Sequence, residues 1–319
     1  SQHIKNLLLA HVFFYRRILF VLSSYMIYTF GCSFTKWYWP TWSDWLARMS
    51  NEPLTNIAWP GLSNETIYWE LLNADIKKTD TVYIMLTGND RTSVWYDDEW
   101  IATNDCRGFF PRRDGKLECS NTQWQGLYRT HPEFELSITH MMVSCFSVIL
   151  QMQLFLNAIG CEYTMLFWQN PWHDTRPIKT PEWQVTWDNK GSLSKKDITR
   201  HDELVKNKYV LNLLHKIDWV KFRFNGEFNV SIPQSYDGLW EYTLFNIAYD
   251  EYWNKFDNHP NTLAHYDYLQ EIILGSETSG IARDVAKNKA IDYKNFELPY
   301  DVTKDLSFLI PDDITENLI

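Results

Sequence analysis

Three residue types that together can perform acyl transfer occur in two short segments far apart in the chain. Ser33 lies in FGCSFT, and Asp257 and His259 lie in DNHP. A serine hydroxyl attacks a carbonyl only when a neighbouring base takes its proton, and histidine does this near neutral pH. An aspartate can hold the imidazole tautomer and stabilise the imidazolium. We therefore predict Ser33 as nucleophile, His259 as base and Asp257 as acid.

The tetrahedral intermediate of such a reaction needs hydrogen-bond donors for its oxyanion. Three candidates follow predicted strands: the backbone N–H of Ser33, the backbone N–H of Gly61 in PGLSN, and the side-chain amide of Asn89 in TGND. Each of these motifs alone is common by chance. Their order at successive strand ends, with DNHP before the last clear helix, is much more specific.

These motifs are positioned by an alternation of short strands and longer helices. The run TVYIML at 81–86 is continuously apolar, which is typical of a strand buried on both faces. Alternating strands and helices predict a parallel sheet covered by helices, with ligands bound at the carboxyl ends of its strands. We expect strands at 26–30, 54–59, 81–86, 162–168 and 219–224, and helices at 37–49, 63–77, 136–159, 198–216 and 262–274.

The 319 residues suit one large domain with insertions, which we place at 26–275. Two stretches, 91–135 and 169–200, break the alternation and are rich in Trp, Pro, Asp and Gly, and long loops of this kind are usually functional. Residues 1–25 are interpreted as a peripheral extension, whose two apolar runs are too short to span a membrane. Residues 276–319 form an acidic tail, a candidate arm for an assembly partner.

The motifs resemble those of the SGNH (GDSL-type) hydrolase superfamily. FGCSFT matches its nucleophile block, PGLSN its glycine block, TGND its asparagine block and DNHP its histidine block. The closest resemblance is to a group, frequent in bacteriophages, with FGCSFT and WPTW near the start and D-x-HP…H near the end. The resemblance covers about 26–275. It implies a three-layer α/β/α flavodoxin-like fold, here with long aromatic-rich insertions, and catalytic roles for Ser33, Gly61, Asn89 and His259.

The chain departs from the family pattern at two positions. Cys32 stands where an aspartate is usual, but that aspartate is not the nucleophile. Asp257 precedes His259 by two residues where three are usual, and many relatives work as Ser–His dyads. The role of Asp257 as the acid is therefore left open. His265 is expected to pack or cap on the last helix.

Four further residues are candidates for substrate contact. Asp90 and Arg91 adjoin Asn89, and Arg91 could bind a substrate carboxylate or pair with a nearby aspartate. Trp172 and His173 follow the fourth predicted strand. The chain has no cluster with zinc spacing, no Walker loop and no dinucleotide-binding glycine motif, so we expect neither a metal nor a cofactor.

The composition excludes some classes of binding partner. The chain has 30 basic and 40 acidic residues, a net charge of −10, which argues against nucleic acid and anionic lipid as partners. Its 16 Trp have two interpretations: exposed indoles could stack on sugar rings, or large aromatic side chains could build the core of long loops.

We expect a serine esterase that removes an acetyl or other small acyl group from a carbohydrate; transfer to another hydroxyl uses the same residues. The alternative is a non-catalytic structural or glycan-binding protein of a virion or cell surface. The sequence leaves open a virion-associated, extracellular or cytoplasmic location.

Overall fold

The computed structural model describes eleven stretches of the chain, and these include the predicted strands and most of the predicted site. The N-terminal residues 1–24, Asp90 and His173 lie outside the described residues, as do most of the two predicted insertions. The described residues are 25–50, 52–89, 91–96, 99–103, 110–111, 117–118, 138–172, 195–254, 257, 259–278 and 280–296.

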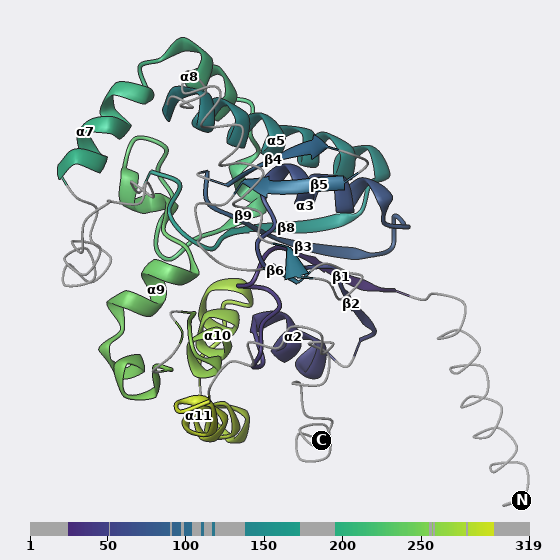
Figure 1. The fold of residues 1–319 in the computed structure, drawn as a ribbon, viewed down its shortest axis with the longest axis vertical. Coiled ribbons are helices and arrows are strands. Elements are labelled where there is room, and N and C mark those ends of the chain that lie inside the picture. The colour runs from purple at the N-terminus through teal and green to yellow at the C-terminus, as the bar shows by residue number, and fades with distance from the viewer. Residues whose placement is uncertain are drawn as a thin grey trace, which may run out of the picture.

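A five-stranded parallel sheet forms the centre of the protein (Figure 1), in agreement with the predicted α/β class. Its strand order is β2-β1-β3-β8-β9, so the chain starts in the interior, moves to one edge and then returns to build the other side. Two antiparallel pairs, β4 with β5 and β6 with β7, lie within the predicted insertion at 91–135. The strands are β1 (Ile27–Phe30), β2 (Leu54–Asn56), β3 (Thr81–Leu86), β4 (Thr92–Tyr96), β5 (Glu99–Thr103), β6 (Phe110–Pro111), β7 (Leu117–Glu118), β8 (Glu162–Phe167) and β9 (Phe222–Arg223).

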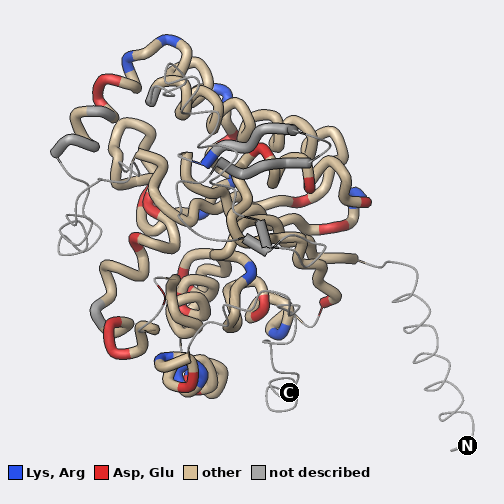
Figure 2. Tube along the Cα trace, in the orientation of Figure 1, with Lys and Arg blue, Asp and Glu red and all other residues tan. Residues whose placement is uncertain are grey.

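The sheet is apolar on both faces because its strands carry few charges. No charged residue occurs in β1, β2 or β3, and Figure 2 shows the charged positions mainly on the helices and turns around the sheet. Along β3, Val82, Ile84 and Leu86 pack on one side, whereas Met85 packs on the other. This alternation is the two-residue period of a strand, and it explains why a continuous apolar run predicts a strand buried on both faces.

Helices cover both faces of the sheet (Figure 1). One core cluster joins the sheet to α3, α5 and α8, and a second joins it to α2, α9, α10 and α11. The α-helices are α2 (Trp42–Ser50), α3 (Asn64–Asn73), α5 (Ile138–Ile159), α7 (Lys195–Leu204), α8 (Lys208–Leu214), α9 (Leu239–Phe245), α10 (Thr262–Tyr268) and α11 (Ile281–Tyr293). Shorter helical turns are η2 (Trp219–Lys221), η3 (Pro233–Tyr236), η4 (Ile247–Tyr252) and the π-helical η5 (Leu269–Ile273).

Several predicted elements are shorter than the sequence pattern indicates. The helix expected at 37–49 begins only at Trp42, after Pro40, and the Asp44 carboxylate accepts the Thr41 N–H at 2.7 Å. The helix expected at 198–216 is interrupted because the Asn207 side chain caps a new helix, α8. Local capping therefore sets boundaries that the apolar period does not.

The expected strand at 54–59 ends early as regular structure but continues to pair with β1. Ile57 N–H donates to the carbonyl of Thr29 at 2.9 Å, and Trp59 N–H donates to that of Gly31 at 3.2 Å. These bonds hold the segment that leads to Gly61 alongside the end of β1.

The helix α5 is long and apolar enough, by length and composition, to cross a membrane. Its buried side chains include Met142, Phe146, Ile149 and Met152, which recur every three or four residues and pack in the core cluster with α3 and the sheet. Burial of this face in the core accounts for part of the apolar composition of the helix.

The predicted tail at 276–319 contains a helix, α11, that packs on the domain itself. Ala286 and Ala290 are buried against the second core cluster. The Arg283 guanidinium forms two 2.8 Å hydrogen bonds with the Asp267 carboxylate of α10. Because the fully buried residues of α11 are alanines, its apolar period is weak in the sequence. Residues 297–319 lie outside the described residues.

Replacing Asn64 by alanine is expected to lower the free energy of unfolding by about 2 kcal/mol, because two buried backbone groups lose their partners. The buried Asn64 amide accepts the Thr87 N–H at 2.8 Å and donates to the Thr87 carbonyl at 3.0 Å, which fixes the end of β3. Urea denaturation measures the effect. The matched control is Asn73→Ala in the same helix, where the amide is exposed and a change below about 0.5 kcal/mol is expected. Equal effects of the two substitutions would contradict the assignment.

Candidate active site

Ser33 lies just past β1, where the strand order of the sheet reverses. The chain leaves β1 through α2 towards β2 on one side, whereas it leaves β3 through α5 towards β8 on the other side, so the loops after β1 and β3 diverge here. Ligands of open parallel sheets bind at such points. A tight turn follows β1, in which the N–H groups of Thr35 and Lys36 donate to the Cys32 carbonyl at 2.9 and 3.2 Å. A Cβ atom at Gly31 would overlap the Thr35 side chain, so glycine is required at the start of this turn.

The structure brings Ser33, His259 and Asp257 together in one hydrogen-bonded chain. His259 Nε2 lies 2.8 Å from Ser33 Oγ, and His259 Nδ1 lies 2.6 Å from Asp257 Oδ1. The same carboxylate oxygen accepts the backbone N–H of His259 at 2.7 Å. Spacing of two residues between acid and base is therefore sufficient, because the turn folds the carboxylate back beneath the ring. This geometry suits proton transfer from the serine hydroxyl to the imidazole.

Solvent reaches the base more easily than the acid. The His259 side chain is 20% exposed, whereas the Asp257 side chain is 5% exposed. Burial raises the pKa of Asp257, but the charge of His259 and the hydrogen bonds from His259 and Trp37 outweigh this effect and hold the pKa below its ordinary value. Asp257 is thus an ionised partner for the imidazole at neutral pH.

Two indole hydrogen bonds attach the histidine segment to the segment that follows Ser33. Trp39 Nε1 donates to the Pro260 carbonyl at 2.8 Å, and Trp45 Nε1 donates to Thr262 Oγ1 at 3.0 Å. Both indole rings are buried. These bonds join residues more than 200 positions apart in the chain and position the start of α10 next to the turn that carries Ser33.

Aromatic rings enclose the imidazole of His259, a feature that the sequence analysis missed. Trp37 stacks on it with ring centres 3.7 Å apart and planes 25° apart, and Phe34 lies at 5.0 Å. Both residues adjoin the nucleophile in FGCSFTKW, but the spacing of apolar residues at 37–49 predicts a helical position for Trp37. The only signal in the sequence was the proximity of these aromatic residues to Ser33.

Two of the three predicted oxyanion donors are backbone groups in suitable loops. Gly61 has a φ of 84°, a left-handed conformation that favours glycine. Among the described residues, neither the Ser33 N–H nor the Gly61 N–H donates a hydrogen bond to another protein group. Both N–H groups are therefore available for an oxyanion.

The third predicted donor, the Asn89 amide, is engaged elsewhere. Its Nδ2 lies 2.7 Å from the Pro171 carbonyl and 2.7 Å from Met142 Sδ, and the side chain is buried. These contacts tie the loop after β3 to the loop after β8. In this arrangement Asn89 braces two strand ends, and an oxyanion role would require its side chain to rotate.

The substitution Asn89→Ala distinguishes a role in bracing the two loops from a role in binding the oxyanion. If the amide braces the loops, the variant loses about 1–3 kcal/mol of unfolding free energy, because a buried carbonyl is left unpaired, while kcat of the folded protein changes little. If the amide instead serves the oxyanion, kcat falls about 10²–10³-fold at nearly unchanged stability. Urea denaturation and ester turnover on the same samples distinguish the outcomes, and the structure favours the first.

Arg91 lies at the side of the site, whereas Trp172 does not face it. The Arg91 guanidinium carbon lies 5.5 Å from the centre of the Trp168 ring, which in turn packs 4.3 Å from Phe34. The Trp172 side chain is 1% exposed and packs at 5.7 Å from Phe146 in the core. Trp172 is therefore placed to support the fold and not to contact substrate.

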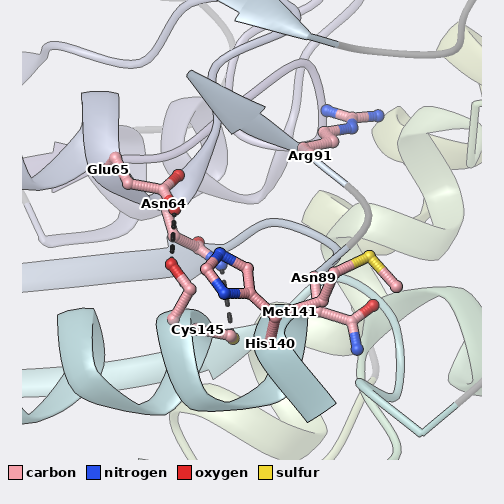
Figure 3. A pocket seen from close by; sticks show the side chains of 8 residues that line it. Asn64, Glu65, Asn89, Arg91, His140, Met141 and Cys145 are labelled. Atoms are coloured by element: carbon pink, nitrogen blue, oxygen red, sulfur yellow. Dashed lines mark hydrogen bonds between the residues drawn. The ribbon is translucent and has the colours of Figure 1, made fainter. Parts of the chain in front are cut away.

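Arg91 and Asn89 also line a small pocket beside α5 (Figure 3). Within it, Ser144 Oγ donates to Glu65 Oε1 at 3.0 Å, and the Asn64 amide contacts Cys145 Sγ at 3.6 Å. Ser33 and His259 are not among its lining residues. The remaining lining residues are His140 and Met141.

No group of three or more His, Cys, Asp or Glu side chains suited to a metal ion occurs in the described part of the chain.

His265 is fully buried in α10, and neither of its ring nitrogens has a hydrogen-bond partner among the described residues. Burial, and secondarily the charge of His259, lower the pKa of His265 to about 3. The ring is therefore neutral in the folded protein at all working pH values. Its burial agrees with the packing role expected from the sequence.

This burial predicts a pH dependence of stability. Below the ordinary histidine pKa of about 6.5, the unfolded chain binds a proton at this residue and the folded chain does not, so stability falls as the pH drops from 6.5 towards 3. His265→Leu is expected to reduce this slope by up to about 1.4 kcal/mol per pH unit. Urea denaturation from pH 7 to 4 measures it. An unchanged slope in His265→Leu would contradict the prediction.

Comparison with protein-family models, curated proteins and solved structures finds no match for this chain.

Proposed function

We propose that this protein is a serine hydrolase of the SGNH type that cleaves carboxylic esters. The observation that carries the proposal is the chain of hydrogen bonds from Ser33 Oγ through His259 to Asp257, at 2.8 and 2.6 Å. Further support comes from the order of the five sheet strands, which corresponds to the 2-1-3-4-5 order of flavodoxin-like folds. The four sequence motifs that resemble the superfamily also lie in loops after β1, β2 and β3 and before α10.

The geometry supports a two-step reaction. Ser33 Oγ attacks the ester carbonyl carbon while its proton moves to His259 Nε2, and Asp257 stabilises the resulting imidazolium. The oxyanion is stabilised by the N–H groups of Ser33 and Gly61. Collapse of the intermediate breaks the ester C–O bond, and the leaving alcohol takes the proton from Nε2. Water, activated by the neutral imidazole, then hydrolyses the acyl-serine and releases the carboxylic acid.

We further propose an acylated carbohydrate, an acetylated one in particular, as the substrate. Trp168, Trp240 and Trp253 are partly exposed and form an aromatic cluster, in which Phe34, beside His259, contacts both Trp168 and Trp240. Ring centres are 6.2 Å apart between Trp168 and Trp240, and 6.0 Å apart between Trp240 and Trp253. Each indole combines an apolar ring face with a polar N–H. The ring face can stack on the apolar face of a sugar ring, and the N–H can bond to a sugar hydroxyl.

Labelling with a fluorophosphonate tests whether Ser33 is activated. The wild type is expected to be labelled and to hydrolyse p-nitrophenyl acetate, while Ser33→Ala loses labelling and at least about 10³-fold in kcat, because it lacks the hydroxyl that His259 would activate. Ser276→Ala, at an exposed serine, is the control and should behave as the wild type. Activity on a panel of acetylated glycans then tests the substrate class.

The opposite result would favour the alternative reading of the sequence. A folded wild type that neither labels nor turns over ester would contradict the hydrolase proposal. It would favour a non-catalytic glycan-binding or structural role, which binding to the same glycans without release of acetate would support.

A further inference from the structure

Trp37 makes two separate contacts with the proposed proton-transfer chain, one to the acid and one to the base. Its indole Nε1 donates to Asp257 Oδ2 at 3.0 Å. Its ring lies face to face with the imidazole of His259, with centres 3.7 Å apart and planes inclined by 25°. No motif of the sequence analysis includes this residue among the site residues.

The indole N–H occupies the carboxylate oxygen that His259 leaves unused. Asp257 Oδ1 accepts both hydrogen bonds from His259, one from the backbone and one from Nδ1. Oδ2 accepts from Trp37. Bonds to both oxygens from different segments fix the rotation of the carboxylate about its own axis. Because hydrogen bonds to charged groups are about twice as strong as neutral ones, this bond also favours the ionised acid.

The ring face acts on the base. A stacked neighbour restricts the imidazole plane, which sets the direction in which Nε2 points towards Ser33 Oγ. The imidazole becomes positively charged during the reaction, and a cation within about 6 Å of an indole face is attracted to it, most strongly when desolvated. Trp37 therefore stabilises the imidazolium more than the neutral ring. Among the described residues, Tyr38 of the same turn and His265 of α10 are further titratable groups that interact with this pair.

Trp37 is itself held in place by a small aromatic cluster. Tyr38 and Trp39 contact it edge to face, with ring centres 5.0 and 6.5 Å away. Trp39 is buried and is bonded to the Pro260 carbonyl, next to His259. The orientation of the indole is thus coupled to the histidine segment through two routes.

We propose that Trp37 is a positioning residue of the hydrolase, whose N–H orients Asp257 and whose ring face orients His259 and favours its charged form. This inference rests on the proposed function. Trp37→Phe keeps a stacking ring and removes the N–H, and Trp37→Leu removes both. Trp219→Phe is the matched control, because Trp219 is also partly buried, donates its indole N–H to a carbonyl at 2.8 Å, and packs against the core cluster that contains α5.

The readouts are kcat, KM, the pH profile of kcat/KM and the rate of fluorophosphonate labelling, each measured on samples whose folding is verified by circular dichroism. Trp37→Phe is expected to lower kcat and the labelling rate about tenfold with KM nearly unchanged. Trp37→Leu is expected to lower both further and to move the acid limb of kcat/KM to lower pH, because the charged imidazole loses its π partner. Trp219→Phe should match the wild type.

Each outcome bears on one proposal or on both. Variants of Trp37 with wild-type kcat and pH profile would overturn the positioning role and leave the hydrolase proposal standing. A fall in activity that only follows the loss of folded protein, with the acid limb unmoved, would also overturn it. An inactive, unlabelled wild type would overturn both. If Trp37→Leu does not fold, the comparison of Trp37→Phe with Trp219→Phe still decides the role of the N–H.

Discussion

The parallel pairing of β1 with β3 is the constraint on which the arrangement of the site depends. Phe30 pairs with Ile84, so both strands end at the same edge of the sheet and their loops start side by side. The segment that carries His259 comes from the far end of the chain and reaches this edge through the indole bonds of Trp39 and Trp45. Since side-chain direction alternates along a strand, a shift of one residue in this register would turn the end of β1 away from the histidine.

Much of the framework could be predicted because buried parallel strands leave a strong pattern. TVYIML and EYTMLF are almost free of charge, and the polar loops that follow strands mark the edge where ligands bind. The association of Ser33 with His259 and Asp257 followed from residue type, from the position of Ser33 after a strand and from that of DNHP before the last clear helix. Its catalytic use stays a prediction, since the geometry supports the chemistry without testing it.

The sequence could not predict the features that depend on distant contacts. Trp37 meets Asp257 across 220 residues, and nothing in FGCSFTKW indicates that its indole turns back towards the acid. The direction of the Asn89 amide depends on Pro171 and Met142, which belong to two other elements. Helix α11 could not be predicted from the sequence because its buried residues are alanines, which contribute little to an apolar period.

The bidentate pair between Arg283 and Asp267 joins α11 to the rest of the domain. The Asp267 side chain is 2% exposed and also accepts a hydrogen bond from Tyr249 at 3.0 Å. A fragment that stopped at residue 275 would lack this guanidinium and also the alanines of α11 that pack against the second core cluster. The acidic C-terminal region thus begins with a helix whose Arg283 neutralises the buried carboxylate of Asp267 in α10. The minimal stable unit therefore extends past the last residue that resembles the hydrolase motifs.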